Sequence, residues 1–401
     1  MNRTKLTSTV KLFMVYIVTG VVCGFVGTVF SKGVSFVTNI RGENEWILFL
    51  LPLAGIASVA IYRLLKVAHM GTNEVIESTG NKTVLSSKLA PAVFCASLLS
   101  HLCGASVGRE GAALQLGGSS AIFLSKRFKL TKEEEKTLIY CGMAGVFSSV
   151  FGTPFAAAVF ALEVVFVGHV YFRAIAPAFI TSQISYYTAV LLGAHAERFA
   201  LTEIPTVNFS VIWKTLVISV FAAAIGVIFC LSLRHAEKLL ERLFKNPYLR
   251  IAIGGSVIVL FTMLIGSYDY NGAGVQVIER IFNDNEFVPL SFAFKILFTC
   301  LAVGAGFKGG EIVPTLFIGA TFGALAGTWL GLPVAFSAAL CMAALFCSVT
   351  NCPFASILLA AELFSGKGIV YISIAVIISY LLSGRISLYT AQKTDGFKNR
   401  F

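Results

Sequence analysis

An arginine and a glutamate stand side by side, between glycines, in the otherwise apolar stretch CGASVGREGAALQLG at residues 103–117. The glycines permit a sharp turn into a new helix, whose first N–H groups have no partner within the helix and attract anions. A carboxylate there, Glu110, competes with an anion while it is ionised and leaves when it is protonated. Glu110 is therefore predicted to couple anion movement to proton movement. The alternative is a first-turn carboxylate that only stabilises its own helix.

An internal duplication places a second carboxylate at the equivalent position. The segment GMAGVFSSVFGTPFAAAVFALEV (142–164) aligns without a gap on CMAALFCSVTNCPFASILLAAEL (341–363), with 10 of 23 positions identical. Nearly the same offset brings GREGAALQLGGSS (108–120) over GGEIVPTLFIGATFG (309–323). Glu311 then stands at the matching helix start, which predicts a proton path with two sites. A buried capping carboxylate is the alternative for Glu311.

Two homologous halves, about 10–190 and 208–392, must position these residues, and the polar stretch 191–207 joins them. Duplicated halves are common in secondary transporters, where they are often inverted and the binding site lies between them. The duplication alone does not show an inversion. In HMGTN (69–73), SVGREGA and FKGGEIVP, glycines precede a new helical run. Three helix starts that point to one place are expected to bind an anion through backbone amides.

The composition places these helices in a membrane. Of the 401 residues, 57% are hydrophobic and 13% are charged, and the mean hydropathy is +0.83. Soluble domains are about 45–50% apolar. The runs 11–30, 46–65 and 374–384 are long enough to cross all or most of a bilayer, and the first reads as a retained helix rather than a signal peptide. The sequence predicts an all-α polytopic membrane protein.

The net charge of +11 is distributed as a membrane protein requires. Basic residues gather in short stretches between apolar runs, including Asn2–Lys5 and Lys393–Arg400, whereas the loops 41–46 and 193–205 are acidic or balanced. This positive-inside pattern predicts cytoplasmic termini, and no basic patch on a soluble module suggests nucleic-acid binding. The nine cysteines form no CxxC pair and the five histidines are scattered, so neither a metal site nor a cofactor is predicted.

Other polar and aromatic residues receive structural interpretations from the pattern alone. Arg109 is favoured as a residue that pairs with a carboxylate or carbonyls and holds its loop, rather than as an anion ligand. Glu163 and Glu362 occur once per half in identical contexts, which indicates an architectural role. Tyr389 could anchor the chain at the membrane interface. Phe317 is one of 35 phenylalanines and does not stand out.

The motifs GREGA (108–112), FGTPFAAAVFALE (151–163), GGEIVP (309–314) and LYT (388–390) together resemble those of the CLC anion channels and transporters. The likeness covers nearly the whole membrane region. It implies a homodimer with an anion pathway in each subunit, a CLC-type inverted repeat of broken and tilted helices, and Glu110 as the gating glutamate. Residues 1–401 are expected to form one transmembrane domain without the cytosolic CBS regulatory pair, because the chain ends just past the last motif.

Three departures from the chloride-type pattern resemble the fluoride/proton antiporter branch of that family, which expels fluoride from bacteria. Met70 stands in place of a serine hydroxyl donor, Val164 replaces the inner proton-transfer glutamate, and Glu311 adds a carboxylate. The resemblance implies a proton-coupled fluoride exporter in the bacterial plasma (inner) membrane, with fluoride, protons and the lipid bilayer as its partners.

The same resemblance implies the site. Glu110 and Glu311 would gate or transfer protons, and the implied anion-binding residues are Met70, Gly71, Gly108, Arg109, Glu110, Gly111, Ile312, Val313, Phe317 and Tyr389. One departure lies within this set: many branch members carry a threonine where Val313 stands, so Thr315 or water would replace its hydroxyl, or the relay differs. Asn73 stands where an aromatic residue is expected.

Two rival functions are weighed against fluoride export. A chloride channel or chloride/proton antiporter of the same fold is opposed by Met70, Val164 and Glu311. An intramembrane enzyme is opposed because the sequence has no HExxH motif and no matched nucleophile–base pair, so the protein is not expected to be an enzyme.

Overall fold

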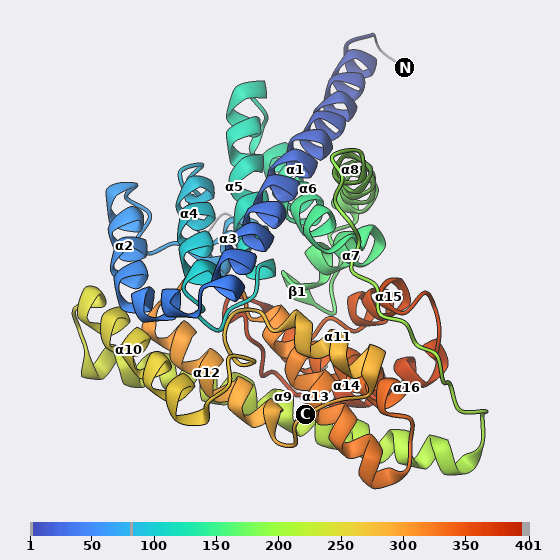
Figure 1. Cartoon of the computed structure of the whole chain (residues 1–401). Helices are drawn as coiled ribbons and strands as arrows, with labels where there is room; N and C mark the ends of the chain where they lie inside the picture. Colours follow the sequence, from blue (N-terminus) through green and yellow to red (C-terminus); the bar gives the residue numbers. More distant parts are fainter. Residues whose placement is uncertain (1–2, 81–82, 395–401) are drawn as a thin grey trace.

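The computed structural model describes residues 3–80 and 83–394, with side chains from Val10 onward (Figure 1). The terminal basic stretches Asn2–Lys5 and Lys393–Arg400, which predicted the orientation, lie almost entirely outside the residues whose side chains are described.

The described chain is mostly helical, and its elements divide at the stretch between α8 and α9. The first half contains α1 (Arg3–Glu43), the 3-10 helix η1 (Glu45–Leu50), α2 (Leu51–Leu64), α3 (Thr72–Ser78), α4 (Leu89–Leu102), α5 (Glu110–Phe128), α6 (Lys132–Phe151), α7 (Pro154–Glu163), β1 (Phe166–Val167) and α8 (Phe172–Leu191). The second contains α9 (Phe209–Leu243), α10 (Pro247–Ile265), α11 (Val275–Asp284), α12 (Ser291–Ala305), α13 (Ile312–Leu330), α14 (Val334–Thr350), α15 (Pro353–Leu363), α16 (Ile369–Leu382) and β2 (Lys393–Thr394).

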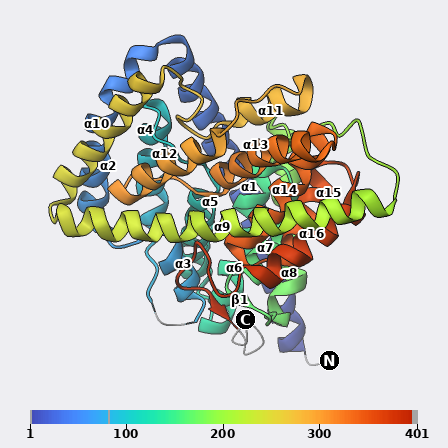
Figure 2. The same ribbon diagram turned by 90° about the horizontal axis from the view of Figure 1, so that it is seen from below.

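The two halves repeat the same succession of helices. The first half occupies the upper part of Figure 1 and the second the lower part, and Figure 2 shows α9 running along the second half. The helices α5 and α13 both have 19 residues, and α7 and α15 have 10 and 11. The helix before each short helix ends at a left-handed residue, Gly152 or Asn351, and a proline begins the next helix. The aligned sequences thus form the same helix–break–helix unit twice.

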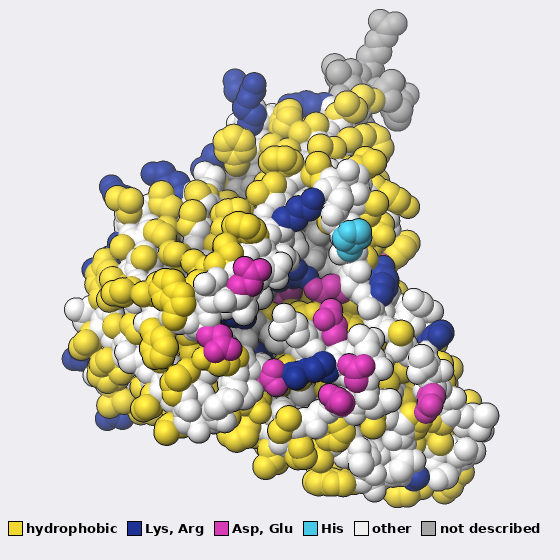
Figure 3. Space-filling view, viewed as in Figure 1, with side chains coloured by type: hydrophobic (Ala, Val, Ile, Leu, Met, Phe, Trp, Pro, Cys, Tyr) yellow, Lys and Arg dark blue, Asp and Glu magenta, His cyan; other side chains and the backbone are white. Residues whose placement is uncertain are grey.

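Length and composition fit a membrane-spanning protein. Five helical segments among the described residues are long and apolar enough to cross a bilayer: Val10–Glu43, Glu45–Leu64, Phe209–Leu243, Pro247–Ile265 and Ile312–Leu330. Figure 3 shows hydrophobic side chains over much of one face. On the long helices, Phe25, Phe36 and Phe221 are exposed, as lipid-facing positions require.

The halves are joined by a reciprocal exchange of hydrogen bonds, which gives Glu163 and Glu362 their architectural role. Glu163, at the end of α7, accepts the N–H groups of Phe354 and Ala355 at the start of α15, at 3.3 and 2.8 Å. Glu362, near the end of α15, accepts the N–H groups at the start of α7 at 3.2 and 2.8 Å. Each carboxylate therefore satisfies the unpaired amides of the other half's short helix.

Candidate functional site

The two glycine-rich loops that precede α5 and α13 meet in the interior. Gly108 and Gly310 form an isolated antiparallel bridge, in which each N–H donates to the other's carbonyl at 2.5 and 2.6 Å. This is the pairing expected when a two-fold axis passes between equivalent loops. The duplication predicted that Glu110 and Glu311 occupy equivalent helix starts, and the fold brings those two starts together.

Glycine is required at this contact because the backbones touch. A methyl group on Gly111 would lie 2.9 Å from Cα of Gly310, and one on Gly108 would lie 3.0 Å from Cδ of Pro314 and 3.2 Å from Cβ of Val313. Real side chains almost never approach to 2.9 Å. The glycines therefore determine how closely the two carboxylate-bearing loops pack.

Glu110 is completely buried, and only one of its two carboxylate oxygens is hydrogen-bonded. Oε2 accepts the backbone N–H of Arg109 at 3.0 Å. Oε1 lies 3.5 Å from Nε of Arg109 and has no hydrogen-bond partner among the described residues. A buried carboxylate with an unsatisfied oxygen is costly while it is charged, so this group has a physical reason to take up a proton.

The end of the Arg109 side chain is engaged by residues outside its own loop. Its guanidinium forms an ion pair with Glu197, and Nη1 donates to the hydroxyl of Ser31 at 2.9 Å. These contacts favour the scaffold role over the ligand role. Glu197 lies in the polar stretch between the halves, and nothing in its surrounding sequence marked it as part of the site.

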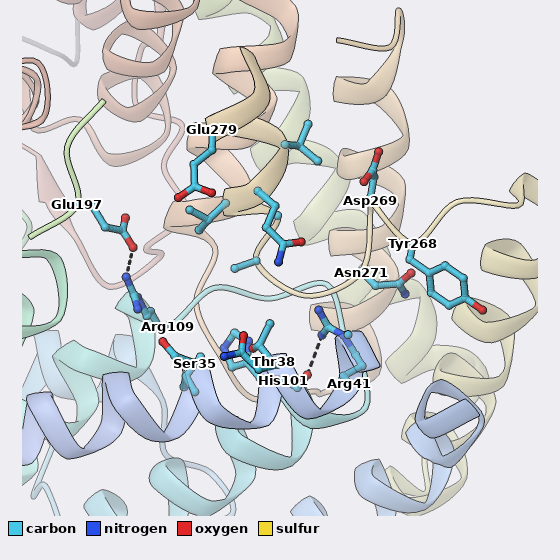
Figure 4. A pocket seen from close by; sticks show the side chains of 18 of the residues that line it. Ser35, Thr38, Arg41, His101, Arg109, Glu197, Tyr268, Asp269, Asn271 and Glu279 are labelled. Carbon is cyan, nitrogen blue, oxygen red and sulfur yellow. Dashed lines mark hydrogen bonds and ion pairs between the residues drawn. The ribbon is translucent and has the colours of Figure 1, made fainter. Parts of the chain in front are cut away.

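Arg109 and Glu197 line a cavity of about 380 Å³ (Figure 4). We call it the outer cavity, because Glu45 and Glu197, which line it, belong to loops that the positive-inside pattern predicts to lie outside the cytoplasm. His101 also lines it; this residue is 1% exposed, and its Nε2 has no hydrogen-bond partner among the described residues. Acidic side chains gather around a hollow on the face shown in Figure 3. The carboxylates that line the cavity are Glu45, Glu197, Asp269 and Glu279.

Glu311 lines a second cavity of about 210 Å³ together with Gly71, Lys308 and Tyr389, here called the inner cavity. Its Oε2 would lie 3.5 Å from a methyl group on Gly111, so it also reaches the loop of Glu110. Tyr389 is 3% exposed, and its hydroxyl has no hydrogen-bond partner among the described residues. That burial places Tyr389 with the inner cavity rather than at a membrane interface.

The third expected helix start differs from the other two. The N–H of Gly71 donates to the carboxylate of Glu74 at 2.7 Å, which caps the seven-residue helix α3 from within. Met70, immediately before it, is buried. Asn73 accepts the N–H of Ala391 at 3.1 Å, so it fixes the C-terminal segment that carries Tyr389.

The first turns of α13 are apolar and closely packed. Ile312, Val313 and Phe317 are all buried. The hydroxyl of Thr315 donates to the carbonyl of Glu311 at 2.7 Å, so its proton is already engaged in the helix.

The Nζ of the fully buried Lys295 lies 5.0 Å from the ring centroid of Phe317 and donates to the carbonyl of Gly272 at 2.7 Å. Lys295 was not predicted as a functional residue, although it is the one charged residue in the apolar run SFAFKILFTC (291–300).

Comparisons with known proteins agree on one family. The model of the voltage-gated chloride channel family matches residues 53–384. A protein of Pseudomonas syringae pv. tomato, named a chloride/fluoride channel protein, is 31% identical over 384 residues, which cover 94% of this chain and 85% of that protein. A solved structure of a CLC-type fluoride/proton antiporter is similar to this chain with a TM-score of 0.93 and 31% identity. The match covers 98% of this chain and 100% of that one. A slow cyanobacterial Cl⁻/H⁺ antiporter shares the fold, with a TM-score of 0.81, 20% identity and coverage of 93% of this chain and 94% of that one.

Proposed function

The chain belongs to the voltage-gated chloride channel family, here called CLC, and from this premise we propose that it exports fluoride in exchange for protons. The observation that carries the proposal is the meeting of two carboxylate-bearing helix starts, hydrogen-bonded through Gly108 and Gly310. The likeness to a fluoride/proton antiporter extends along nearly the whole chain and supports it further.

Glu110 is proposed as the gate of the pathway. While ionised, its carboxylate occupies the place of an anion near the start of α5. A proton from the outer cavity neutralises the carboxylate and ends its attraction to the helix start, so that an anion can take its place. Because the same group excludes the anion and carries the proton, the two movements are coupled. Its unsatisfied Oε1 supports this role.

On the inner side, Glu311 and Tyr389 are proposed to receive protons and anions. Both line the inner cavity, and Glu311 lies against the loop of Glu110. In the first half, the residue after Glu163 is the buried Val164, which cannot carry a proton. Glu311 then supplies the second carboxylate of the path, and the engaged hydroxyl of Thr315 leaves water as the simpler substitute at Val313.

Fluoride is small and strongly hydrated, so a selective site must offer strong donors for the water it displaces. Backbone amides at the starts of α5 and α13 are proposed as such donors, with Gly108, Gly111, Ile312 and Val313 forming the backbone and Phe317 an apolar wall. The capped amide of Gly71 contributes only when Glu74 moves away. Met70 leaves its part of the path without the hydroxyl that suits chloride.

The setting of the protein completes the proposal. We place it in the bacterial plasma membrane, surrounded by lipid, as a homodimer with both termini in the cytoplasm. Residues 10–190 and 208–392 act as the inverted halves of one transport domain, and the transporter carries out no chemical conversion. The five long apolar segments support the membrane setting.

Replacing Met70 by serine tests the selectivity. Met70→Ser returns a hydroxyl donor, and we expect the ratio of chloride to fluoride flux to rise about tenfold, equal to about 1.4 kcal/mol. The fluxes are measured with ion-selective electrodes as anions leave loaded liposomes. Met263→Ser, at an exposed position of α10, is the matched control and should leave the ratio unchanged. Equal fluoride and chloride fluxes in the unaltered protein would instead favour a chloride transporter.

A further inference from the structure

The polar stretch between the halves is packed against both of them. The N–H of Glu197 donates to the carbonyl of Phe151 at 3.4 Å, and the N–H of Phe199 donates to that of Leu363 at 3.0 Å. Arg198 donates to the carbonyl of Gly152 at 3.1 Å. Phe199 also stacks on Phe282 of α11, with ring centroids 5.1 Å apart. The backbone that carries the Glu197 side chain is therefore held by α6, α11 and α15 together.

That carboxylate competes with Glu110 for one guanidinium. Figure 4 shows Arg109 directed towards Glu197 at the outer cavity. Towards Glu110 the side chain offers only Nε, at 3.5 Å, which is too long for a good hydrogen bond. A guanidinium can form two parallel bonds with one carboxylate, and this stronger arrangement with Glu110 is not formed here.

We propose that Glu197 is a positioning residue of the transport cycle: it holds the Arg109 guanidinium in the outer cavity and so keeps it from forming the stronger two-bond pair that would further stabilise the ionised form of Glu110. This inference rests on the proposed role of Glu110 as the proton-coupled gate. It assigns to the connection between the halves a function in transport, because the contact sets how readily the gate accepts an external proton.

The groups that surround Glu110 allow the effect to be isolated. Arg109 is adjacent to Glu110, and Glu197 faces Arg109 from the linker. His101 of α4 lies against Gly108, Glu311 directly precedes the facing helix α13, and Tyr389 approaches from the C-terminal segment. Glu279 on α11 lines the same cavity, and burial together with the charge of Glu197 raises the pKa of its carboxyl. Among the described residues, the Arg109 guanidinium contacts Glu197 and Ser31 rather than Glu279, so Glu279 separates a general effect of charge from a direct contact with the guanidinium.

The test is the dependence of fluoride/proton exchange on external pH in liposomes. In Glu197→Gln the guanidinium is free to form two parallel bonds with Glu110 in place of its single contact through Nε, and one negative charge is gone. Both changes favour the ionised gate, so the external proton concentration for half-maximal exchange should rise about tenfold. Glu197→Asp retains the charge and should keep the midpoint much closer to that of the unaltered protein. Glu279→Gln removes a charge from the same cavity and should shift the midpoint far less.

Three outcomes overturn the inference. They are an unshifted midpoint in Glu197→Gln, a fall in rate that is equal at every pH, or a shift of the same size in Glu279→Gln. In a Glu110→Gln background the shift should vanish, and its persistence would place the action of Glu197 elsewhere. Absence of proton coupling in the unaltered protein contradicts the proposed function itself, whereas intact coupling with an unshifted variant contradicts only this inference.

If Glu197→Gln fails to fold, the same inference is tested with a cysteine variant that is modified chemically after reconstitution. Glu197→Cys is prepared with Cys95, the exposed native cysteine among the described residues, replaced by serine. After reconstitution, an external thiol reagent that adds a sulfonate should restore the original midpoint, because it returns a negative charge beside Arg109. A reagent that adds an ammonium group should move the midpoint further towards acid. Equal midpoints after the two reagents contradict the proposal.

Discussion

Glu110→Gln is expected to lower fluoride-driven proton movement at least about 100-fold, an effect of about 2.7 kcal/mol or more on the coupled step. Glutamine has nearly the shape of the protonated glutamate, but it cannot release a proton or return to the charged form that competes with the anion. Fluoride movement should continue without protons. The measurement follows fluoride with an electrode and protons with a dye in the same liposomes.

Glu45→Gln is the matched control for this result, because Glu45 lines the outer cavity and is exposed. Coupling should be retained in that variant. Proton movement that stays coupled to fluoride in Glu110→Gln would show that another residue carries the proton, and the assignment of the gate would then be wrong.

Gly310→Ala is expected to abolish transport and to destabilise the fold by about 1–3 kcal/mol, the usual cost of overpacking a closely packed site. The added methyl group would collide with the backbone of Gly111. The two loops would have to move apart, and the hydrogen bonds between Gly108 and Gly310 would break. Fluoride flux and thermal unfolding of the purified protein measure the two effects.

Gly42→Ala provides the comparison, since a methyl group at Gly42 would meet nothing within 4 Å. This variant should transport and unfold like the unaltered protein. If Gly310→Ala did the same, the two loops would not need to touch, and the close approach of the helix starts would have no functional meaning.

The sequence predicted the features that are encoded locally or repeated. The glycines before Glu110 and Glu311 predicted the helix starts: Glu110 is the first residue of α5, and Glu311 directly precedes the first residue of α13. The duplication predicted equivalent places for those residues, and the fold joins their two loops through Gly108 and Gly310. The identical contexts of Glu163 and Glu362 indicated architecture, and their reciprocal hydrogen bonds confirm it. A repeated motif is informative because each copy must form the same local structure.

The rest depends on contacts between distant segments. Glu197 meets Arg109 across 88 residues of sequence, and its own neighbourhood looks like an ordinary polar linker. Asn73 bonds Ala391 across 318 residues, which explains why an amide stands where an aromatic residue was expected. The capping of Gly71 by Glu74 is local, and the spacing of the two residues could have predicted it.

The most direct test of fluoride/proton exchange is proton movement against a gradient. Liposomes that contain the protein are loaded with fluoride, held at zero membrane potential with potassium and valinomycin, and started with the interior already more acidic than the outside. As fluoride leaves, fluoride/proton exchange should bring protons in and acidify the interior further. Hydrogen fluoride that leaks through lipid carries protons outwards, so it cannot imitate this result. Fluoride efflux without proton entry, or equal proton entry driven by chloride, would contradict the account.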